Sequence, residues 1–296
     1  MALTVFDVML AAHEGVGTIS YGVSSAGTTL TLNDRTESSA FADDTFNGGT
    51  LFFIESTKLS IQGQTRRVTD YNATSGQFTF TTVLSSAVTA NTKYAVATPE
   101  FNYTLMERLV NSALRSVGPL VYTDRTMQSS ANQRVYAMST LAGRGKPFRV
   151  DIMGRTGSSA DDPQWVKLHG WYIQPSTVGA GQAIVFPRDL PANRDIRILY
   201  EADHPAVSAS TQIIDDRLHP ELVTTMLIEK MYSFRNSRSR GAQEFDVQRW
   251  SDAKRQSAEA RIRWPVYRPK RAPDVLVIGD GDGDVGVRAP PYGPLA

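Results

Sequence analysis

The stretch TPEFNYTLMERLVNSALRSVGP, residues 98–119, decides how the rest of the chain is organised. Its apolar side chains return every three to four residues, which is the period of an α-helix with one buried face. Thr98 can cap this helix, Pro99 suits its first position, and Gly118 followed by Pro119 ends it. A single short helix is marginal in water, so we expect partner helices. The apolar stripe consists of Phe101, Leu105, Leu109, Ala113 and Val117, flanked by Met106, Val110 and Leu114.

On either side of this helix the apolar period changes to two residues, which predicts β-structure. Residues 16–98 are rich in Thr, Ser, Gly and aromatics, with turn signals at 47–49 (NGG) and 70–76. We expect each of the two blocks, 16–98 and 120–210, to form a small β-barrel or sandwich. The strand candidates of the second block are RVYAMST (134–140), PFRVDIM (147–153), WVKLHGWYI (165–173), QAIVF (182–186) and DIRILYEAD (195–203).

Further helices are predicted at both ends of the chain. Residues 3–13 place most of their apolar side chains on one face, and 211–264 contains two helices, one from Pro220 and one over 242–263. Between these two, RNSRSRG at 235–241 is interpreted as a basic hinge. The predicted fold class is α+β, a helical bundle with two β-rich (barrel/sandwich-like) insertions and an extended C-terminal arm. Its parts are 1–15, 16–98, 99–119, 120–210, 211–264 and the Pro/Gly/Asp-rich arm 265–296.

Composition excludes several classes of protein. The net charge is +1, so there is no overall attraction to nucleic acid or membrane. The absence of cysteine excludes disulfides, thiolate metal sites and cysteine nucleophiles. No apolar run approaches the ~18 residues of a membrane-spanning helix. The first ten residues lack a basic region and carry Asp7, so we expect no signal peptide and a soluble protein used without export.

No pattern for catalysis or metal binding stands out. The histidines, His13, His169, His204 and His219, are scattered, and we interpret them as ordinary surface or capping residues. Asp280, Asp282 and Asp284 resemble the start of a calcium loop, but Val285 and Pro291 stand where that loop needs Gly and Glu.

The remaining candidates for chemistry also fail on spacing. GRGK at 143–146 lacks the spacing of a phosphate loop, and there is no Gly-x-Ser-x-Gly elbow. The carboxylate pairs at 161–162 and 215–216 are adjacent in sequence, so their side chains point apart, and we expect turn or cap roles for both. We therefore expect no enzyme activity, no metal and no cofactor.

The charge pattern of residues 230–271 carries more information, with twelve Lys and Arg against four Asp and Glu. This excess favours a surface that faces DNA or an acidic neighbour, while a solvated helix face is the plain alternative. The candidates for a DNA channel are Arg235, Arg238 and Arg240. The candidates for a subunit interface are Phe101, Leu105, Leu109, Phe245, Trp250, Trp264 and Tyr267.

Three segments carry a resemblance to a known family. DTFNGGTLFFIESTKLSIQGQTRRVTDYNATSGQFTFT (44–81) resembles a β insertion of tailed-phage virion proteins, and LMERLVNSALRSVG (105–118) and 194–231 resemble the helices of head–tail connector (adaptor) subunits. The resemblance implies a homo-oligomeric ring, expected to be a dodecamer, that joins capsid to tail. It also implies binding to the portal protein and to the next neck or tail protein, with transient, non-specific contact to passing DNA and none to membrane.

The same resemblance implies a place in the virion neck, reached by assembly in the host cytoplasm, with the C-terminal arm on the portal. Two alternatives stay open. The chain can be another phage virion structural protein, such as a tail, baseplate or decoration component. It can also be a carbohydrate-binding β module, in which Trp165 and Trp171 would stack on sugars.

Overall fold

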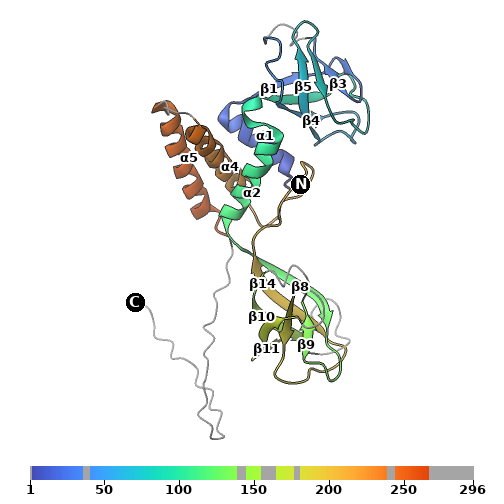
Figure 1. Ribbon diagram of the computed structural model, residues 1–296, viewed down its shortest axis with the longest axis vertical. Coiled ribbons are helices and arrows are strands. Elements are labelled where there is room, and N and C mark those ends of the chain that lie inside the picture. The colour runs from blue at the N-terminus through green and yellow to red at the C-terminus, as the bar shows by residue number, and fades with distance from the viewer. Residues whose placement is uncertain are drawn as a thin grey trace.

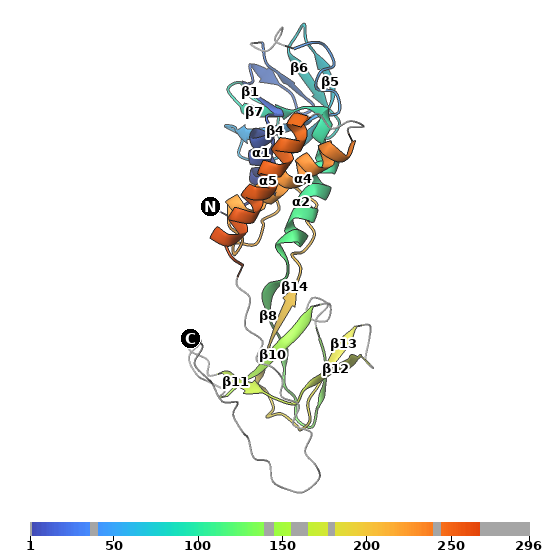
Figure 2. The same ribbon diagram turned by 90° about the vertical axis from the view of Figure 1, so that its left-hand side faces the viewer.

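The computed structural model describes residues 2–35, 41–138, 145–154, 165–176, 181–238 and 244–266. Within these ranges the fold is α+β, with four α-helices and three antiparallel sheets. Figures 1 and 2 show a layer of helices between two β regions, an upper one and a lower one. The chain forms the upper region between α1 and α2, and the lower region between α2 and α4.

The helical layer consists of α1 (Val5–Val16), α2 (Tyr103–Val117), α4 (Pro220–Arg238) and α5 (Glu244–Arg263). Helix α4 lies at its centre, because it contacts each of the other three. The helix predicted at 3–13 is present as α1, with shifted ends, and it begins with a capping box between Thr4 and Asp7. It ends at Gly17, whose φ of 72° is the left-handed conformation that glycine adopts without strain.

The start of α2 differs from the prediction. Residues Pro99–Phe101 form a separate 3₁₀ turn, and Thr98 makes no capping hydrogen bond with its side chain. The backbone of Asn102 is extended, and its side-chain oxygen accepts a hydrogen bond of 3.0 Å from the Leu105 N–H, so Asn102 caps α2. The break turns Phe101 into the core, where its side chain is fully buried.

The upper region is one seven-stranded sheet in the order β1-β7-β4-β5-β6-β3-β2. Its interior strand β4 is buried on both faces: Phe52 packs into the core of the helical layer, whereas Leu51 and Phe53 pack into the sheet's own aromatic core. The aromatic core therefore holds the upper sheet together, while the core of the helical layer joins the sheet to the helices. The strands are β1 (Ile19–Val23), β2 (Ala26–Gly27), β3 (Thr31–Asn33), β4 (Thr50–Glu55), β5 (Thr65–Asn72), β6 (Gln77–Phe80) and β7 (Lys93–Ala97).

The lower region contains a four-stranded sheet, β11-β10-β14-β8, and a three-stranded sheet, β12-β13-β9. Strands β8 and β14 pair along most of their length and lead from the helices into this region (Figure 1). One cluster of buried side chains draws on both sheets. The strands are β8 (Leu120–Gln128), β9 (Val135–Ala137), β10 (Lys146–Met153), β11 (Trp165–Leu168), β12 (Tyr172–Pro175), β13 (Gln182–Val185) and β14 (Asp195–Ala202).

Three expectations about the β regions are corrected. No sheet closes into a barrel within the described residues, since the strand order of each sheet ends in two separate edges. Strand β8 is absent from the predicted strands, although its nine residues lie within the block expected to be β. The strand predicted at 165–173 is split between two sheets, because Gly170 takes a φ of 73° and turns the chain between β11 and β12.

The predicted hinge at 235–241 is also corrected, since α4 continues to Arg238. Residues 239–243 lie outside the described ranges, and so does the tail from 267, which includes most of the expected arm. No helix in the described part of the chain combines the length and the apolar content that crossing a membrane requires.

Candidate functional site

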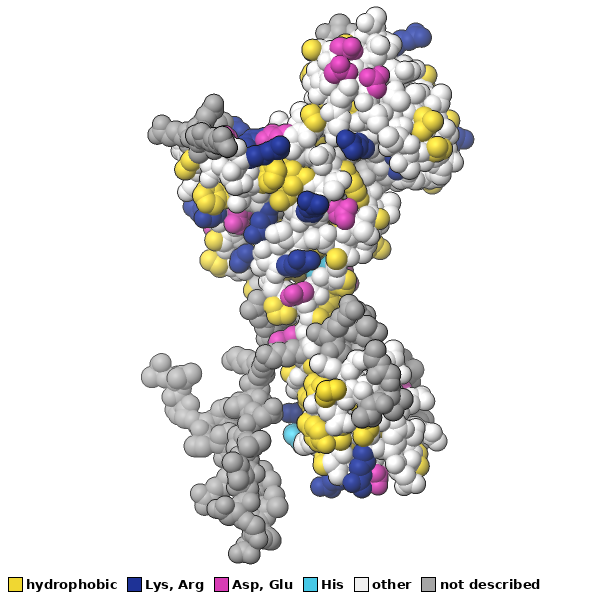
Figure 3. All heavy atoms as spheres, viewed as in Figure 1, with side chains coloured by type: hydrophobic (Ala, Val, Ile, Leu, Met, Phe, Trp, Pro, Cys, Tyr) yellow, Lys and Arg dark blue, Asp and Glu magenta, His cyan; other side chains and the backbone are white. Residues whose placement is uncertain are grey.

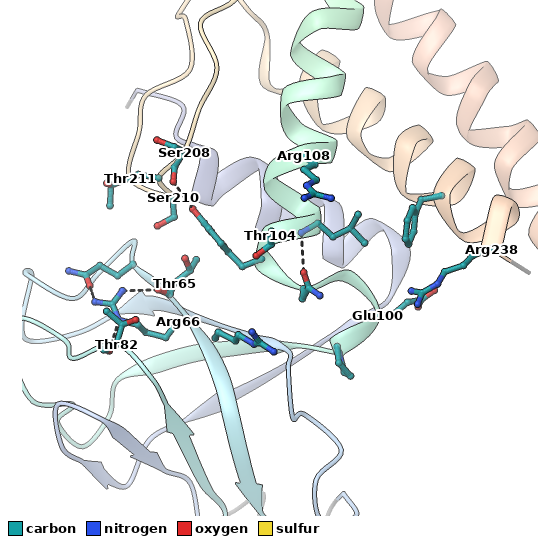
Figure 4. A pocket seen from close by; sticks show the side chains of 18 residues that line it. Thr65, Arg66, Thr82, Glu100, Thr104, Arg108, Ser208, Ser210, Thr211 and Arg238 are labelled. Carbon is teal, nitrogen blue, oxygen red and sulfur yellow. Dashed lines mark hydrogen bonds between the residues drawn. The ribbon is translucent and has the colours of Figure 1, made fainter.

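A groove of about 980 Å³ lies where the upper sheet meets the start of α2 and the end of α4. Its walls come from five places in the sequence: the beginning of β5, Thr82 just after β6, the turn before α2 with the first turns of α2 itself, the segment 208–211, and the end of α4. Figure 4 shows the sheet residues Arg66 and Thr82 on one side, with Thr104 and Arg108 of α2 facing them. The groove is therefore built by tertiary packing.

Hydrogen bonds hold the 208–211 wall in place. The Asn111 side chain donates to Val207 O and accepts from Val207 N–H, each at 2.8 Å. The Phe6 N–H donates to Ser210 O at 2.8 Å, and the Ser210 hydroxyl donates to Gly63 O at 3.3 Å. Helix α1, helix α2 and the turn between β4 and β5 therefore all hold the chain at Val207–Ser210, which fixes this wall of the groove.

Arginine is the dominant charged residue of the groove. Arg66, Arg67, Arg108 and Arg238 line it, and Glu100 is the one carboxylate among the described lining residues. Arg66 donates to Thr82 O at 3.0 Å and to Thr65 O at 2.7 Å, so it is anchored on backbone carbonyls. Partial burial lowers the pKa of Arg66, but an arginine still carries its charge at neutral pH.

Glu100 is already neutralised by a residue beside the groove. Arg235 of α4 donates to both of its carboxylate oxygens, at 2.7 and 2.6 Å, in a two-pronged geometry. These hydrogen bonds to Glu100 raise the pKa of Arg235. The guanidinium also lies over the Phe101 ring, 5.4 Å from its centroid. The four groove arginines are thus left without a balancing carboxylate in the described part of the groove.

Positive charge continues down the same side of α2. Arg108 and Arg115 are two turns apart on this helix and also line a smaller hollow of about 470 Å³ with Asn111 and Ala206. Figure 3 shows Lys and Arg side chains spaced along the helical layer up to its junction with the upper sheet. A ligand that lies across the groove can therefore meet further cations along α2.

The three residues predicted to face a DNA channel have different environments in the structure. Arg235 is half-buried and forms an ion pair with Glu100 of its own chain, so its charge is already balanced and it is a weak candidate for contact with DNA. Arg238 is exposed at the end of the groove, with its guanidinium 5.7 Å from the centroid of the Phe234 ring. Arg240 lies outside the described residues.

The predicted interface residues also fall into different places. Phe101 is fully buried in the helical core and presents no surface to a neighbour, so it is removed from the candidates. The fully buried face of α2 is Met106, Val110, Ala113 and Leu114, whereas Leu105 and Leu109 are half-buried at its border. The side chain of Phe245 and all of Tyr267 lie outside the described residues.

The two tryptophans of α5 and its end make contacts within the subunit. Trp250 packs at the edge of the helical core, with Lys254 Nζ 3.9 Å from its ring centroid. Trp264 stacks flat on His219, with 3.5 Å between the ring centroids, and its indole N–H donates to Glu221 at 2.9 Å. Both side chains are half-buried and keep some surface for a neighbour.

The histidines are separated from one another, as predicted, but one is in the core. His13 is completely buried beside Phe52 and Phe101, which corrects its interpretation as a surface or capping residue. Burial lowers its pKa to about 4. No group of three potential ligand side chains able to hold a metal occurs among the described residues.

Other predicted polar roles follow local geometry. His204 Nδ1–H donates to Pro205 O at 2.7 Å, and its Nε2 accepts from the Asp215 N–H at 3.1 Å. Asp215 accepts from the Arg217 N–H at 3.1 Å, which confirms its expected place in a turn. The pair at 161–162 and the acidic residues 280–284 lie outside the described ranges.

The two tryptophans proposed for sugar stacking both contact other side chains of the lower region. The guanidinium carbons of Arg197 and Arg125 lie 4.4 and 5.5 Å from the Trp165 ring centroid. Trp171 packs against the lower core. Both side chains are half-buried, so these contacts take part of the aromatic surface that stacking on a sugar ring would use.

Sequence reasoning missed most of the groove. Arg66, Arg67 and Arg108 lie outside the basic stretch 230–271, and no local pattern connects them. The adjacent arginines in a strand were a possible signal, since one of them must point away from the sheet's buried face. In comparisons with known proteins, no family model matches this chain and no curated protein matches it in sequence.

Proposed function

We propose that the protein is a structural subunit of a tailed-phage neck: a head–tail connector whose copies form a ring below the portal. The ring joins the capsid to the tail and lets DNA pass. The role is one of assembly, without catalysis and without a resident cofactor. In this proposal the helices build the wall of the ring, and residues 265–296 extend onto the portal.

The observation that carries the proposal is the open outer face of α5. This helix packs chiefly on α4 through small buried side chains, Ala253, Ser257 and Ala260. On its other sides Val247 and Ile262 are exposed, Ile262 by 81%. Burying one such side chain against a second copy contributes about 1.5–3 kcal/mol. A ring would cover this face on every subunit.

The segments that resemble connector subunits support the proposal through their positions. Residues 105–118 fall on α2, and 194–231 run from β14 into α4, which packs against α2. Residues 44–81 cover β4, β5 and β6 of the upper sheet. The exposed cations along α2 suit contact with phosphates of passing DNA without recognition of its sequence.

The test is the assembly state of the full chain, measured by native mass spectrometry and negative-stain electron microscopy. We expect rings, dodecameric by the resemblance, and we expect Ile262→Glu to weaken them. Leu59→Glu is the matched control, because Leu59 is equally exposed, at 80%, but lies in the upper region. A chain that stays monomeric at every concentration and is missing from purified virions contradicts the proposal.

A further inference from the structure

The groove presents concentrated positive charge that nothing described in the subunit balances. Arg67 and Arg108 are exposed, and neither makes an ion pair with a described residue. Arg66 is held in place by carbonyl oxygens, and Arg238 rests near the Phe234 ring. Because like charges in one concave site repel each other, an anionic ligand would gain from all four at once.

The lining of the groove also indicates what kind of anion fits. Leu105, Phe234 and Pro99 supply apolar surface, while Thr65, Thr104 and Ser208 supply hydroxyl groups between the arginines. A concave site with mixed apolar and polar walls suits an extended peptide that alternates carboxylates with aliphatic side chains. A DNA duplex is convex and uniformly charged, so it would touch only the rim.

The chain itself contains a segment with this chemistry. Residues 272–287 read APDVLVIGDGDGDVGV, with four aspartates and no Lys or Arg. Val275–Ile278 (VLVI) form an aliphatic run next to the acidic part, and the glycines at 281 and 283 let the backbone approach a wall closely. The number of acids equals the number of arginines in the groove.

The distances allow this segment to reach a groove. The last described residue is Val266, just beyond α5, whose 20 residues span ~30 Å. The fourteen residues from Val266 to Asp280 can extend to at most ~46–50 Å. That length covers the helical layer from end to end, so the segment can reach the groove of its own chain or that of an adjacent copy.

We propose that the arginine-lined groove is the docking site for the acidic segment Asp274–Asp284 of this same protein. The aspartates at 280, 282 and 284, which this length carries as far as the groove, bind among its four arginines, and the aliphatic run packs on Leu105 and Phe234. This inference rests on the charges and shape of the groove and does not depend on the role in a phage neck; if that role holds, the part of the arm beyond Asp284 would contact the portal. It makes the groove a contact between copies of the chain, or between the tail and its own body.

The chain has no cysteine, so a disulfide between two introduced cysteines reports contact without background. One cysteine replaces Gly281 in the acidic segment, and the other replaces Thr104, an exposed residue on the groove wall. The matched control is Thr74→Cys, also exposed, in the turn beyond the far end of β5. Both pairs are made in the full chain and oxidised gently. Mixtures of singly substituted chains then distinguish contact between copies from contact within one.

We expect the Thr104 pair to cross-link at least about tenfold more than the Thr74 pair, because docking raises the local concentration. About 1 M salt should abolish the difference, since it screens charges beyond ~3 Å. The difference in cross-linking should also disappear in the triple variant Asp280→Asn/Asp282→Asn/Asp284→Asn. It should disappear as well in the double variant Arg67→Gln/Arg108→Gln, which changes two exposed side chains that take no part in core packing. Equal cross-linking at both positions, or cross-linking that ignores these charges, overturns the proposal. The proposal is also overturned if the groove binds a short DNA duplex through Arg67 and Arg108 and the Thr104 pair does not cross-link.

Discussion

Replacement of His13 by Gln tests how a buried imidazole links stability to pH. His13 is completely buried, its Nδ1 lies 2.8 Å from the Thr18 hydroxyl, and its Nε2 has no hydrogen-bond partner. Protonation would place an uncompensated charge among Phe52 and Phe101. Burial therefore lowers the pKa of His13 from 6.5 to about 4.

The sign and size of the effect follow from this pKa. The unfolded chain binds a proton on His13 below pH 6.5, whereas the folded chain binds it only below about pH 4. Stability contributed by neutral His13 is thus complete above pH 6.5 and is lost as the pH falls through that window. At ~1.4 kcal/mol for each pH unit, the loss amounts to about 3 kcal/mol at pH 4.

The assay is urea unfolding followed by far-ultraviolet circular dichroism, at several pH values between 7.5 and 4. His13→Gln cannot be protonated in this range but keeps a polar group for Thr18. We expect the free energy of unfolding of the wild type to fall by about 3 kcal/mol more than that of the variant. Asp189 and Asp215, whose pKa values are lowered by hydrogen bonds from Arg134 and Arg217, titrate equally in both proteins and cancel. Two parallel pH profiles would refute the reasoning.

Three further changes test the packing. Val110→Asp should abolish the helical circular dichroism, because Val110 is fully buried and an unpaired charge there costs several kcal/mol, whereas Leu109→Asp at the border of the core should still fold. Asn111→Ala should lower the free energy of unfolding in urea by about 1–3 kcal/mol, since it leaves the Val207 N–H and carbonyl without their partner; a change near zero would mean that water replaces it. Asp151→Ala should cost about 1.5–3 kcal/mol, because it removes the carboxylate that accepts hydrogen bonds from Arg149 and Arg197, while Glu55→Ala, in an exposed pair with Lys93, should cost under about 1 kcal/mol in the same experiment.

The order of helices and strands was largely accessible from local pattern. The stripe of 101–117 predicted α2, and the alternation around Phe78 and Phe80 predicted β6. These signals are local because each element must bury one face, and burial leaves its period in the sequence. The errors fell where a local choice depended on distant atoms. Phe101 leaves the helix because the core beneath the upper sheet holds its ring.

The groove and its charges were decided by the tertiary structure alone. Arg66, Arg108 and Arg238 come from three separate elements and meet only because β4 and β7 pack on the helical layer. Arg235 belonged to the same basic run as Arg238, yet folding paired it with Glu100, 135 residues away. A sequence states which charges exist, but their partners depend on how buried faces bring distant surfaces together. Composition and period therefore determined the elements, and the packing of those elements determined which arginines remain to bind a ligand.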